Sequence, residues 1–449
     1  MDTGSTAWIL ASSMAVSLMV PGLALFYGGM TAARSTLNMM MMVFGAVAVT
    51  GVLWILYGYS AVFGNSYGGV GILGDVTEYL GLGQLLVEQP DLTLPPALVA
   101  AFQALFAAIT VALVAGAVAD RMKFGAWMVF AGFWVSLVYL PVAHWVFAFD
   151  AADGSVVGGW IANRLGAIDF AGGTAVHINA GIAGLALVLV LGRRTSWPRP
   201  SRPHNLPATV LGAGILWFGW FGFNGGSALA AGNAASVVFL NTFGATCAAL
   251  LAWLVVEKLR DGHATTLGAA SGAIAGLVAI TPSCGAVSPV GALLVGLVAG
   301  AVCPLAVGLK HRFGYDDALD VVGVHLVGGV IGTLLIGLLA TDAAPNGRAG
   351  LFYGGGFGLL GVQAVAAGAV MAYSFVVTLL LALVLKAVMG LRVTEAAEVQ
   401  GVDVAVHAES AYDLAAGSPV GGGSLPHPIA TAAPRRGSAS TPVVETVLD

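Results

Sequence analysis

The stretch DFAGGTAVHINAGIAG, from Asp169 to Gly184, carries an ionisable side chain, His177, inside a segment apolar enough to cross a membrane. A second stretch, DVVGVHLVGGVIG from Asp320 to Gly332, does the same with His325. Aligned on their histidines, both stretches read Val-His-x-x-x-Gly-x-x-Gly. Ionisable residues within a membrane are costly and usually face a bundle interior or a cavity. Both histidines are therefore predicted functional residues.

The composition around these stretches is that of an integral membrane protein. Of 449 residues, 58% are hydrophobic and only 9% are charged, and the mean hydropathy is +0.92. The 64 glycines suit membrane helices that pack closely. The net charge of -5 and the scattered basic residues give no indication of nucleic-acid binding. The three cysteines lack metal-ligand spacing and are interpreted as packing residues, so no metal site is predicted.

Windows without charged residues predict eleven spanning helices, the eighth being the shortest. They cover Ala7–Tyr27, Leu37–Val62, Ala97–Ala119, Phe124–Phe147, Gly172–Leu191, Leu206–Leu229, Ala234–Val256, Thr265–Thr281, Val287–Leu309, Val321–Ala340 and Gly361–Leu385. Basic residues concentrate on the cytoplasmic side of membrane proteins. With the N-terminus outside and the C-terminus inside, every Lys and Arg except Arg164 and Arg348 falls on the inner side. We therefore expect that orientation in an all-α fold.

Eleven spans divide into two five-helix halves and one extra helix. Because five is odd, consecutive halves would have opposite topology, forming the inverted repeat of many transport proteins. The histidines fall on spans five and ten, and FYGG (Phe26–Gly29) at the inner end of span one matches FNGG (Phe223–Gly226) at the outer end of span six. We expect residues 1–390 to form the transmembrane domain and 391–416 to dock on the inner loops. Residues 417–449, rich in Gly, Ser, Pro and Thr, are predicted to be disordered.

Two neutral imidazoles can share a proton between ring nitrogens, which places a donor and an acceptor in an apolar bore without burying net charge. Such a pair would suit a small hydrogen-bonding solute. Each histidine could instead bond a backbone carbonyl between helices, or the two could be axial ligands of haem in an electron carrier. The sequence contains no phosphate loop, nucleophile elbow or zinc-protease motif, so no enzyme and no cofactor is predicted.

Aromatic side chains and one carboxylate lie near the predicted ends of spans three, five and six. Phe102 and Phe106 share a helix face, and Phe223 closes the run WFGWFGF. Aromatic faces can hold a small cation, although aromatic residues near membrane interfaces usually serve packing. Asp169 precedes span five, where it is read as a helix cap or as a source of negative potential for an outer vestibule.

Several long motifs resemble those of a known family. They are FQALFAAITVALVAGAVADRMKF, AIDFAGGTAVHINAGIAGL, RPHNLPATVLGAGILWFGWFGFNGGSALA, GAIAGLVAITPSCG, DVVGVHLVGG and GLRVTEAAEVQGVDVAVHAESAYD. They are similar to the ammonium transporters, the Amt/Mep branch of the Amt/Mep/Rh superfamily, over essentially the whole chain to about Leu414. The resemblance implies a multi-pass plasma-membrane protein of three identical subunits, each with its own pore for ammonium or ammonia. It also implies a PII-type signal protein docking on the inner face; an ammonium sensor of the same fold and an Rh-like gas channel are the alternatives.

The resemblance also assigns roles to individual residues. According to this resemblance, His177 and His325 are the twin histidines of the pore, and Phe106 and Phe223 form a stacked gate. Ser227 supplies the hydroxyl of an outer recruitment site, which Asp169 supports. Trp220 and Thr281 lie next to the pore.

One position departs from the family pattern. Many bacterial members have Trp at the end of AH-x-V-W, whereas this chain reads AHWVF, so Phe147 stands in the recruitment site. Phenylalanine offers a weaker cation–π face and no indole N–H, so a weaker outer site is expected. Trp145, two residues earlier, is a candidate substitute.

Overall fold

The computed structural model describes residues 1–87, 89, 92–199 and 202–412, so the predicted disorder of 417–449 lies outside the described residues. Residues Met1–Ala411 form one unit. Its α-helices are α1 Thr3–Met30, α2 Thr36–Leu53, α3 Tyr59–Phe63, α4 Pro96–Val114, α5 Phe124–Trp134, α6 Leu140–Phe147, α7 Asn179–Leu191, α8 Leu206–Gly226, α9 Asn233–Asp261, α10 Thr266–Ile280, α11 Pro289–Phe313, α12 Val327–Leu339, α13 Gly358–Val388 and α14 Glu395–Gln400.

Shorter helical turns extend or connect these helices. The π-helical ones are Trp54–Gly58, Val135–Tyr139, Ile161–Leu165, Gly173–Ile178, Val322–Leu326 and Asp403–His407. The 3₁₀ turns are Ala33–Ser35, Tyr67–Gly69, Leu80–Leu86, Ala115–Val118 and Leu351–Tyr353. The described residues form no β-sheet and only isolated β-bridges. The predicted all-α fold class is confirmed.

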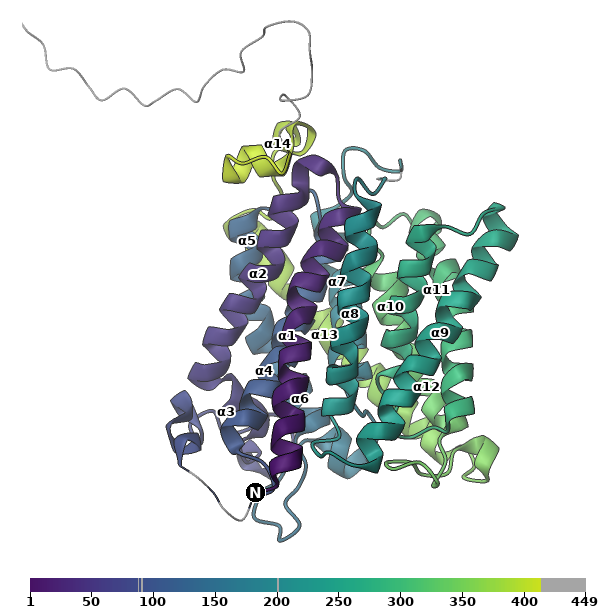
Figure 1. The fold of residues 1–449 in the computed structure, drawn as a ribbon. Coiled ribbons are helices and arrows are strands. Elements are labelled where there is room, and N and C mark those ends of the chain that lie inside the picture. Colours follow the sequence, from purple (N-terminus) through teal and green to yellow (C-terminus); the bar gives the residue numbers. More distant parts are fainter. Residues whose placement is uncertain (88, 90–91, 200–201, 413–449) are drawn as a thin grey trace, which may run out of the picture. The chain divides into compact units, whose positions relative to one another are not determined.

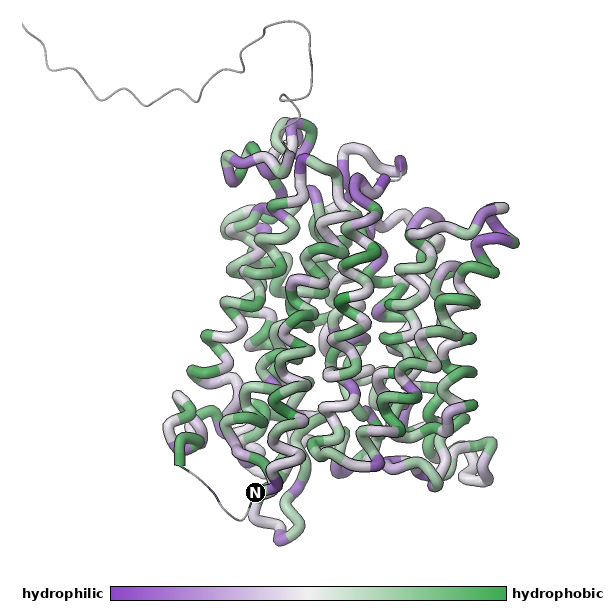
Figure 2. The backbone as a smooth tube through the Cα atoms, viewed as in Figure 1, coloured by the Kyte–Doolittle hydropathy of each residue, from purple (hydrophilic) through white to green (hydrophobic). Residues whose placement is uncertain are grey.

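Length and apolarity make this a membrane-spanning fold. Ten helical stretches among the described residues are long and apolar enough to cross a membrane. The remaining predicted span, the short eighth window, corresponds to α10, which has 15 residues. Exposed side chains such as Leu251, Leu297 and Leu380 lie on α9, α11 and α13, where they would be costly in water and suit contact with lipid. Figure 2 shows hydrophobic residues along the middles of the helices and hydrophilic ones gathered at the ends near α14.

This unit has two opposite faces. The N-terminal face carries the start of α1 and the end of α6, and the tail face, opposite to it, carries α14 (Figure 1). The helix with His177 starts at the N-terminal face, whereas the helix with His325 starts at the tail face. The two histidine helices therefore run in opposite directions, as an inverted repeat requires.

A buried ion network ties the helix ends together at the tail face. The Arg194 guanidinium contacts Asp316 at 2.8 Å and Asp120 at 3.3 Å. Arg121, also buried, donates through Nε to the Gly192 carbonyl at 2.9 Å. Burial acts to raise the pKa of Asp316, but the hydrogen bonds and positive charge of Arg194, with the charge of Arg121, outweigh it and hold that pKa below its ordinary value. These contacts join the ends of α4 and α7 to the segment that precedes His325.

The last described segment packs on the same face. The Glu398 carboxylate accepts from the Thr195 amide at 2.6 Å. Asp403 accepts from the amides of Leu37 at 3.0 Å and Asn38 at 2.7 Å, so it caps the first turn of α2. Residues of α14 and the turn after it are thus bonded to two loops of the tail face. The domain boundary at residue 391 and the cytoplasmic location of this segment stay predictions.

Replacing Arg194 with Met is expected to destabilise the protein by about 3 to 5 kcal/mol, because the buried carboxylates of Asp316 and Asp120 would lose their ion-pair partner. Thermal unfolding in detergent measures this. Arg312→Met, at an exposed tail-face position, is the matched control. Equal melting temperatures for the two variants would contradict this account of the network.

Candidate functional site

Both pore-candidate histidines lie in π-helical turns. His177 is in the turn Gly173–Ile178, which continues into α7, and His325 is in the turn Val322–Leu326, which continues into α12. A π-turn holds an extra residue within the helix, and such turns are frequent at functional sites. The sequence echo around the two histidines is therefore also a structural echo.

An aspartate caps each of these turns. Asp169 accepts from the amides of Gly172, Gly173 and Thr174 at 2.6–2.8 Å, which confirms its predicted role as a cap. Asp317 accepts from the amides of Val321 at 3.1 Å and Val322 at 2.7 Å. Each aspartate lies eight residues before its histidine. The sequence analysis did not single out Asp317 as a cap, although its spacing from His325, equal to that of Asp169 from His177, indicates that role.

Asp317 also has an unusual electrostatic setting. Its pKa is raised to about 6, because burial and the charge of Asp320 outweigh the Lys310 ammonium and the hydrogen bonds from the Val321 and Val322 amides, which act to lower that pKa. Its carboxylate thus lies beside a lysine and a second aspartate at the tail-face end of the histidine helix.

Glycines bring the two histidine helices into backbone contact. α7 packs against the π-turn of His325, and α12 packs against the π-turn of His177. A Cβ atom at Gly181 would lie 2.4 Å from the Leu326 amide nitrogen, and one at Gly329 would lie 3.1 Å from that of Ile178. Both glycines stand four residues after a histidine in the repeated motif. Only glycine leaves room for the first of these approaches.

The crossing joins the two imidazoles directly. Nδ1 of His325 lies 3.3 Å from Nδ1 of His177, at hydrogen-bond distance, and the rings are nearly parallel, with 22° between their planes and 5.4 Å between their centres. Both side chains are buried, with residue exposures of 1% and 4%. One Nδ1 therefore donates and the other accepts. Nε2 of His177 is buried and makes no hydrogen bond with the described residues.

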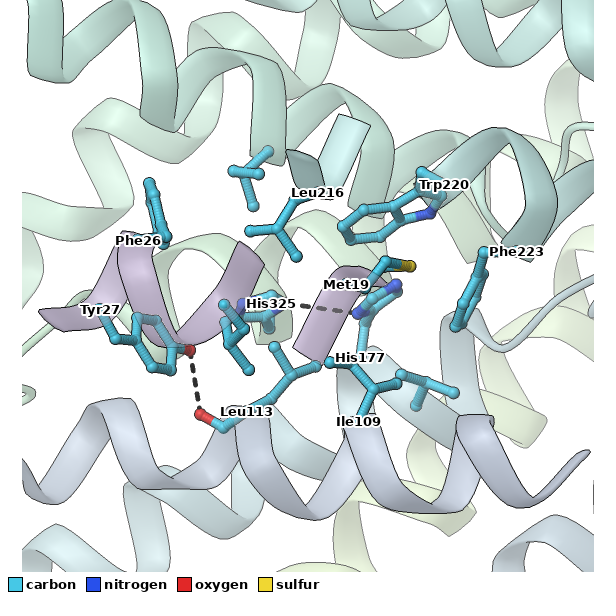
Figure 3. Close-up of a pocket in the computed structure, with 13 residues that line it drawn as sticks. Met19, Phe26, Tyr27, Ile109, Leu113, His177, Leu216, Trp220, Phe223 and His325 are labelled. Carbon is cyan, nitrogen blue, oxygen red and sulfur yellow. Dashed lines mark hydrogen bonds between the residues drawn. The ribbon is translucent and has the colours of Figure 1, made fainter. Parts of the chain in front are cut away.

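Aromatic rings cover the pair towards the N-terminal face. Trp220 stacks on His177 with ring centres 5.4 Å apart, and its indole N–H donates to the Thr281 hydroxyl at 2.8 Å. Phe106 stacks on Phe223 with centres 4.0 Å apart. In Figure 3, Trp220 and Phe223 lie to one side of His177, and His325 and then Tyr27 follow on the other. The structure thus brings together six of the residues singled out in the sequence: His177, His325, Phe106, Phe223, Trp220 and Thr281.

The other predicted site residues lie beyond these rings. The half-buried Ser227 donates its hydroxyl to the Phe223 carbonyl at 2.8 Å. Phe147 lies beside Gly172, where an added Cβ would be 3.5 Å from the Phe147 ring, so it adjoins the loop that Asp169 caps.

Trp145 is engaged elsewhere. Its indole N–H donates to the Ile72 carbonyl at 2.8 Å, and its ring packs against Trp160 and Tyr373. Trp145 as a substitute for the missing tryptophan therefore stays a prediction.

Three cavities in succession lead past the histidines. The first is lined by Phe223, Trp220, both histidines, Tyr27 and otherwise apolar side chains, and offers about 10 Å³ to the centre of a water-sized solute. Roughly 10–15 Å³ by this measure holds one such molecule. The second shares Tyr27 and His325 with the first and reaches Asp320, and the third, of about 220 Å³, begins at Asp320. The space at the histidines is therefore single-file, and it widens at the tail face.

This geometry excludes the haem alternative. A porphyrin with its iron would have to separate the two imidazoles, whereas their nitrogens lie 3.3 Å apart beside a cavity that holds about one water-sized molecule. The alternative of bis-histidine haem ligation therefore does not fit this geometry.

Comparison with known proteins decides the family. A family model described as "Ammonium Transporter Family" matches residues 7–412. The chain belongs to the ammonium transporter family. It is 57% identical over 440 residues to an ammonium transporter of Mycobacterium tuberculosis, covering 93% of this chain and 92% of that relative.

Solved structures agree with this membership. Saccharomyces cerevisiae Mep2 superposes with a TM-score of 0.79 at 36% identity, covering 88% of this chain and 91% of Mep2. A structure described as "Sensor Amt Protein" gives a TM-score of 0.81 at 30% identity, covering 90% and 98% of the two chains. The resemblance to the Amt/Mep branch is confirmed, and this family member is a multi-pass membrane protein.

Replacing Gly181 with Ala is expected to cost about 1–3 kcal/mol, because the new methyl group would push against the Leu326 backbone and force α7 away from the π-turn of His325. Thermal unfolding measures the cost. Gly368→Ala in α13, where an added Cβ meets nothing within 4 Å, is the control and should be neutral or stabilising. A Gly181 variant as stable as the control would contradict the proposed crossing.

Proposed function

We propose that this protein moves ammonium across the plasma membrane by binding the cation at the N-terminal face and passing ammonia along the histidine pair. The observation that carries the proposal is the His177–His325 hydrogen bond beside a single-file apolar cavity. Membership of the ammonium transporter family supports the substrate. In this proposal the N-terminal face is outside the cell, as the distribution of basic residues predicts.

The cavity lining favours a neutral solute. An unpaired cation is expensive to place in an apolar, water-excluded space, so ammonium gives up a proton before or within the bore. Ammonia then meets ring nitrogens that can accept or donate a hydrogen bond, His177 Nε2 among them. Potassium and sodium have no proton to give up, and they would have to enter as ions. The pathway would thus select ammonium over potassium and sodium by its ability to lose a proton, rather than by ion size.

Two routes remain for the released proton. It can pass along the hydrogen-bonded imidazoles, which would make transport electrogenic, or return to the outer solution, which would make it neutral. The Nδ1-to-Nδ1 bond supports the first route, since it already links the two rings through one proton.

The recruitment site is proposed at Ser227, Phe106, Phe147 and Asp169. Ser227 offers a hydroxyl oxygen just beyond the stacked Phe106 and Phe223 rings, and aromatic faces attract a small cation most strongly where water is scarce. The Asp169 carboxylate is turned to backbone amides, so its contribution is to fix the loop beside Phe147 and to add negative potential. Phe106 and Phe223 together are the proposed gate.

A sensor role is the second candidate, because the fold is as similar to the structure described as a sensor as to Mep2. A sensor would bind ammonium with little flux and signal through residues beyond α13, whereas a transporter shows flux. The homotrimer, the PII-type partner and the Rh-like gas channel stay predictions of the resemblance.

Replacing both His177 and His325 with Leu is expected to lower selective ammonium conduction about tenfold or more, since a desolvated solute would lose its hydrogen-bonding partners in the bore. The measurement is ammonium-driven change of internal pH in proteoliposomes. His263→Leu, at an exposed tail-face position, is the control. Unchanged rate and selectivity in the double variant would refute the proposed pathway.

Replacing Phe147 with Trp is expected to lower the half-saturating ammonium concentration about two- to fivefold, the factor for a cation–π gain of about 0.5–1 kcal/mol. The concentration dependence of uptake measures it. Phe149→Trp, at an exposed position two residues after the end of α6, should leave the value unchanged. No difference between the variants would remove Phe147 from the site.

A further inference from the structure

The tail-face end of the pathway holds a lysine bound to a carboxylate. The Lys310 ammonium group contacts Asp320 Oδ1 and donates to the Asp317 carbonyl at 3.1 Å. The two charged side chains are 13% and 23% exposed. Asp320 lines both the cavity that contains His325 and the 220 Å³ cavity beyond it, and Lys310 lines the latter. This ion pair therefore lies on the route that leads away from the histidines.

The opposite end of the pathway lacks such a pair. Asp169 corresponds to Asp317 by its spacing from a histidine and by its bonds to the following amides. Within the part of the chain that the structure describes, Asp169 takes part in no ion pair. The two mouths thus share a carboxylate cap, but among the described residues an ion pair lies beside the cap only at the tail-face mouth, where Lys310 contacts Asp320.

Lysine has the chemistry of the substrate. Its head group is a compact, strongly hydrated ammonium with three donors, whereas arginine carries a broad planar fork. Two aspartates at one mouth, Asp317 and Asp320, would otherwise attract and hold a small cation. The stem of Lys310 comes from α11, at the wall of the wide cavity, so its head group reaches Asp320 from the side.

We propose that Lys310 is a tethered ammonium ion that occupies the cation site at the tail-face mouth, so that ammonium is not held where the solute leaves the pore. This inference rests on the proposed function of the histidine pathway. Lys310 is then a specificity-determining residue. The N-terminal mouth can bind ammonium, whereas the cation site at the tail-face mouth is already occupied by the Lys310 ammonium group. Ammonium accumulating on the tail-face side then does not block the exit.

The test uses proteoliposomes with the tail face towards the lumen and measures the initial uptake of radiolabelled methylammonium, with and without ammonium chloride inside. A radiolabelled tracer keeps its own gradient in both conditions. For Lys310→Met, internal ammonium is expected to slow uptake about fivefold more than for the unmodified protein, a factor that corresponds to an ion pair of typical strength. Lys258→Met, an exposed tail-face lysine, should behave like the unmodified protein.

Two further variants separate occupancy from a merely structural role. Lys310→Arg should retain resistance to internal ammonium, and Lys310→Met combined with Asp320→Asn should regain it, because the carboxylate that binds the cation is then gone. Equal sensitivity in Lys310→Met and the unmodified protein would overturn the proposal. So would an inactive Lys310→Met that the Asp320 replacement does not restore. Failure of the unmodified protein to transport would instead count against the proposed function.

Discussion

The structure depends on the close crossing of two helices that run in opposite directions. At this crossing, Gly181 meets the Leu326 backbone and Gly329 meets the Ile178 backbone, each four residues beyond a histidine. Side chains larger than hydrogen at Gly181 would separate the helices, and with them the two imidazoles. Both histidines lie within π-turns, and the aspartate caps satisfy backbone amides at the start of these turns. The hydrogen-bonded histidine pair is thus a product of backbone geometry.

Once the pair is formed, its surroundings determine what it can do. Mostly aliphatic and aromatic side chains line a space that holds about one water-sized molecule, so a charge is disfavoured and a hydrogen bond is valuable there. Stacked phenylalanines close one side, and on the other the path widens towards charged groups. The proposal of ammonia conduction follows from this contrast between a dry middle and polar ends. We propose that the ends differ in cation binding: the N-terminal mouth has a carboxylate cap and is open to the cation, whereas Lys310 occupies the acidic site at the tail-face mouth.

Much of the fold could be predicted from the sequence, because the hydropathy and charge patterns extend over segments of about 20 residues. The spans, the repeated motif and the Asp169 cap follow from patterns that are visible in the linear sequence.

The π-turns could not be predicted, since an added residue per turn leaves no trace in apolar segments that lack a polar stripe. Trp145 could not be placed either, because only the folded loop brings the Ile72 carbonyl to its indole. The partner of Lys310 depends on a turn between α11 and the next helix that spacing alone does not define. Asp317, by contrast, was detectable by the same spacing that marks Asp169.

The central claim is that His177 and His325 are neutral rings joined by one shared hydrogen bond at neutral pH. Solid-state NMR of the protein in lipid, with ¹⁵N-labelled histidine and single-histidine variants for assignment, measures the protonation of each ring nitrogen directly. The account predicts two neutral rings, with Nδ1 protonated in one and unprotonated in the other, and a coupling between these two nitrogens. A permanently charged imidazolium, or two Nδ1 atoms with no coupling, would contradict it.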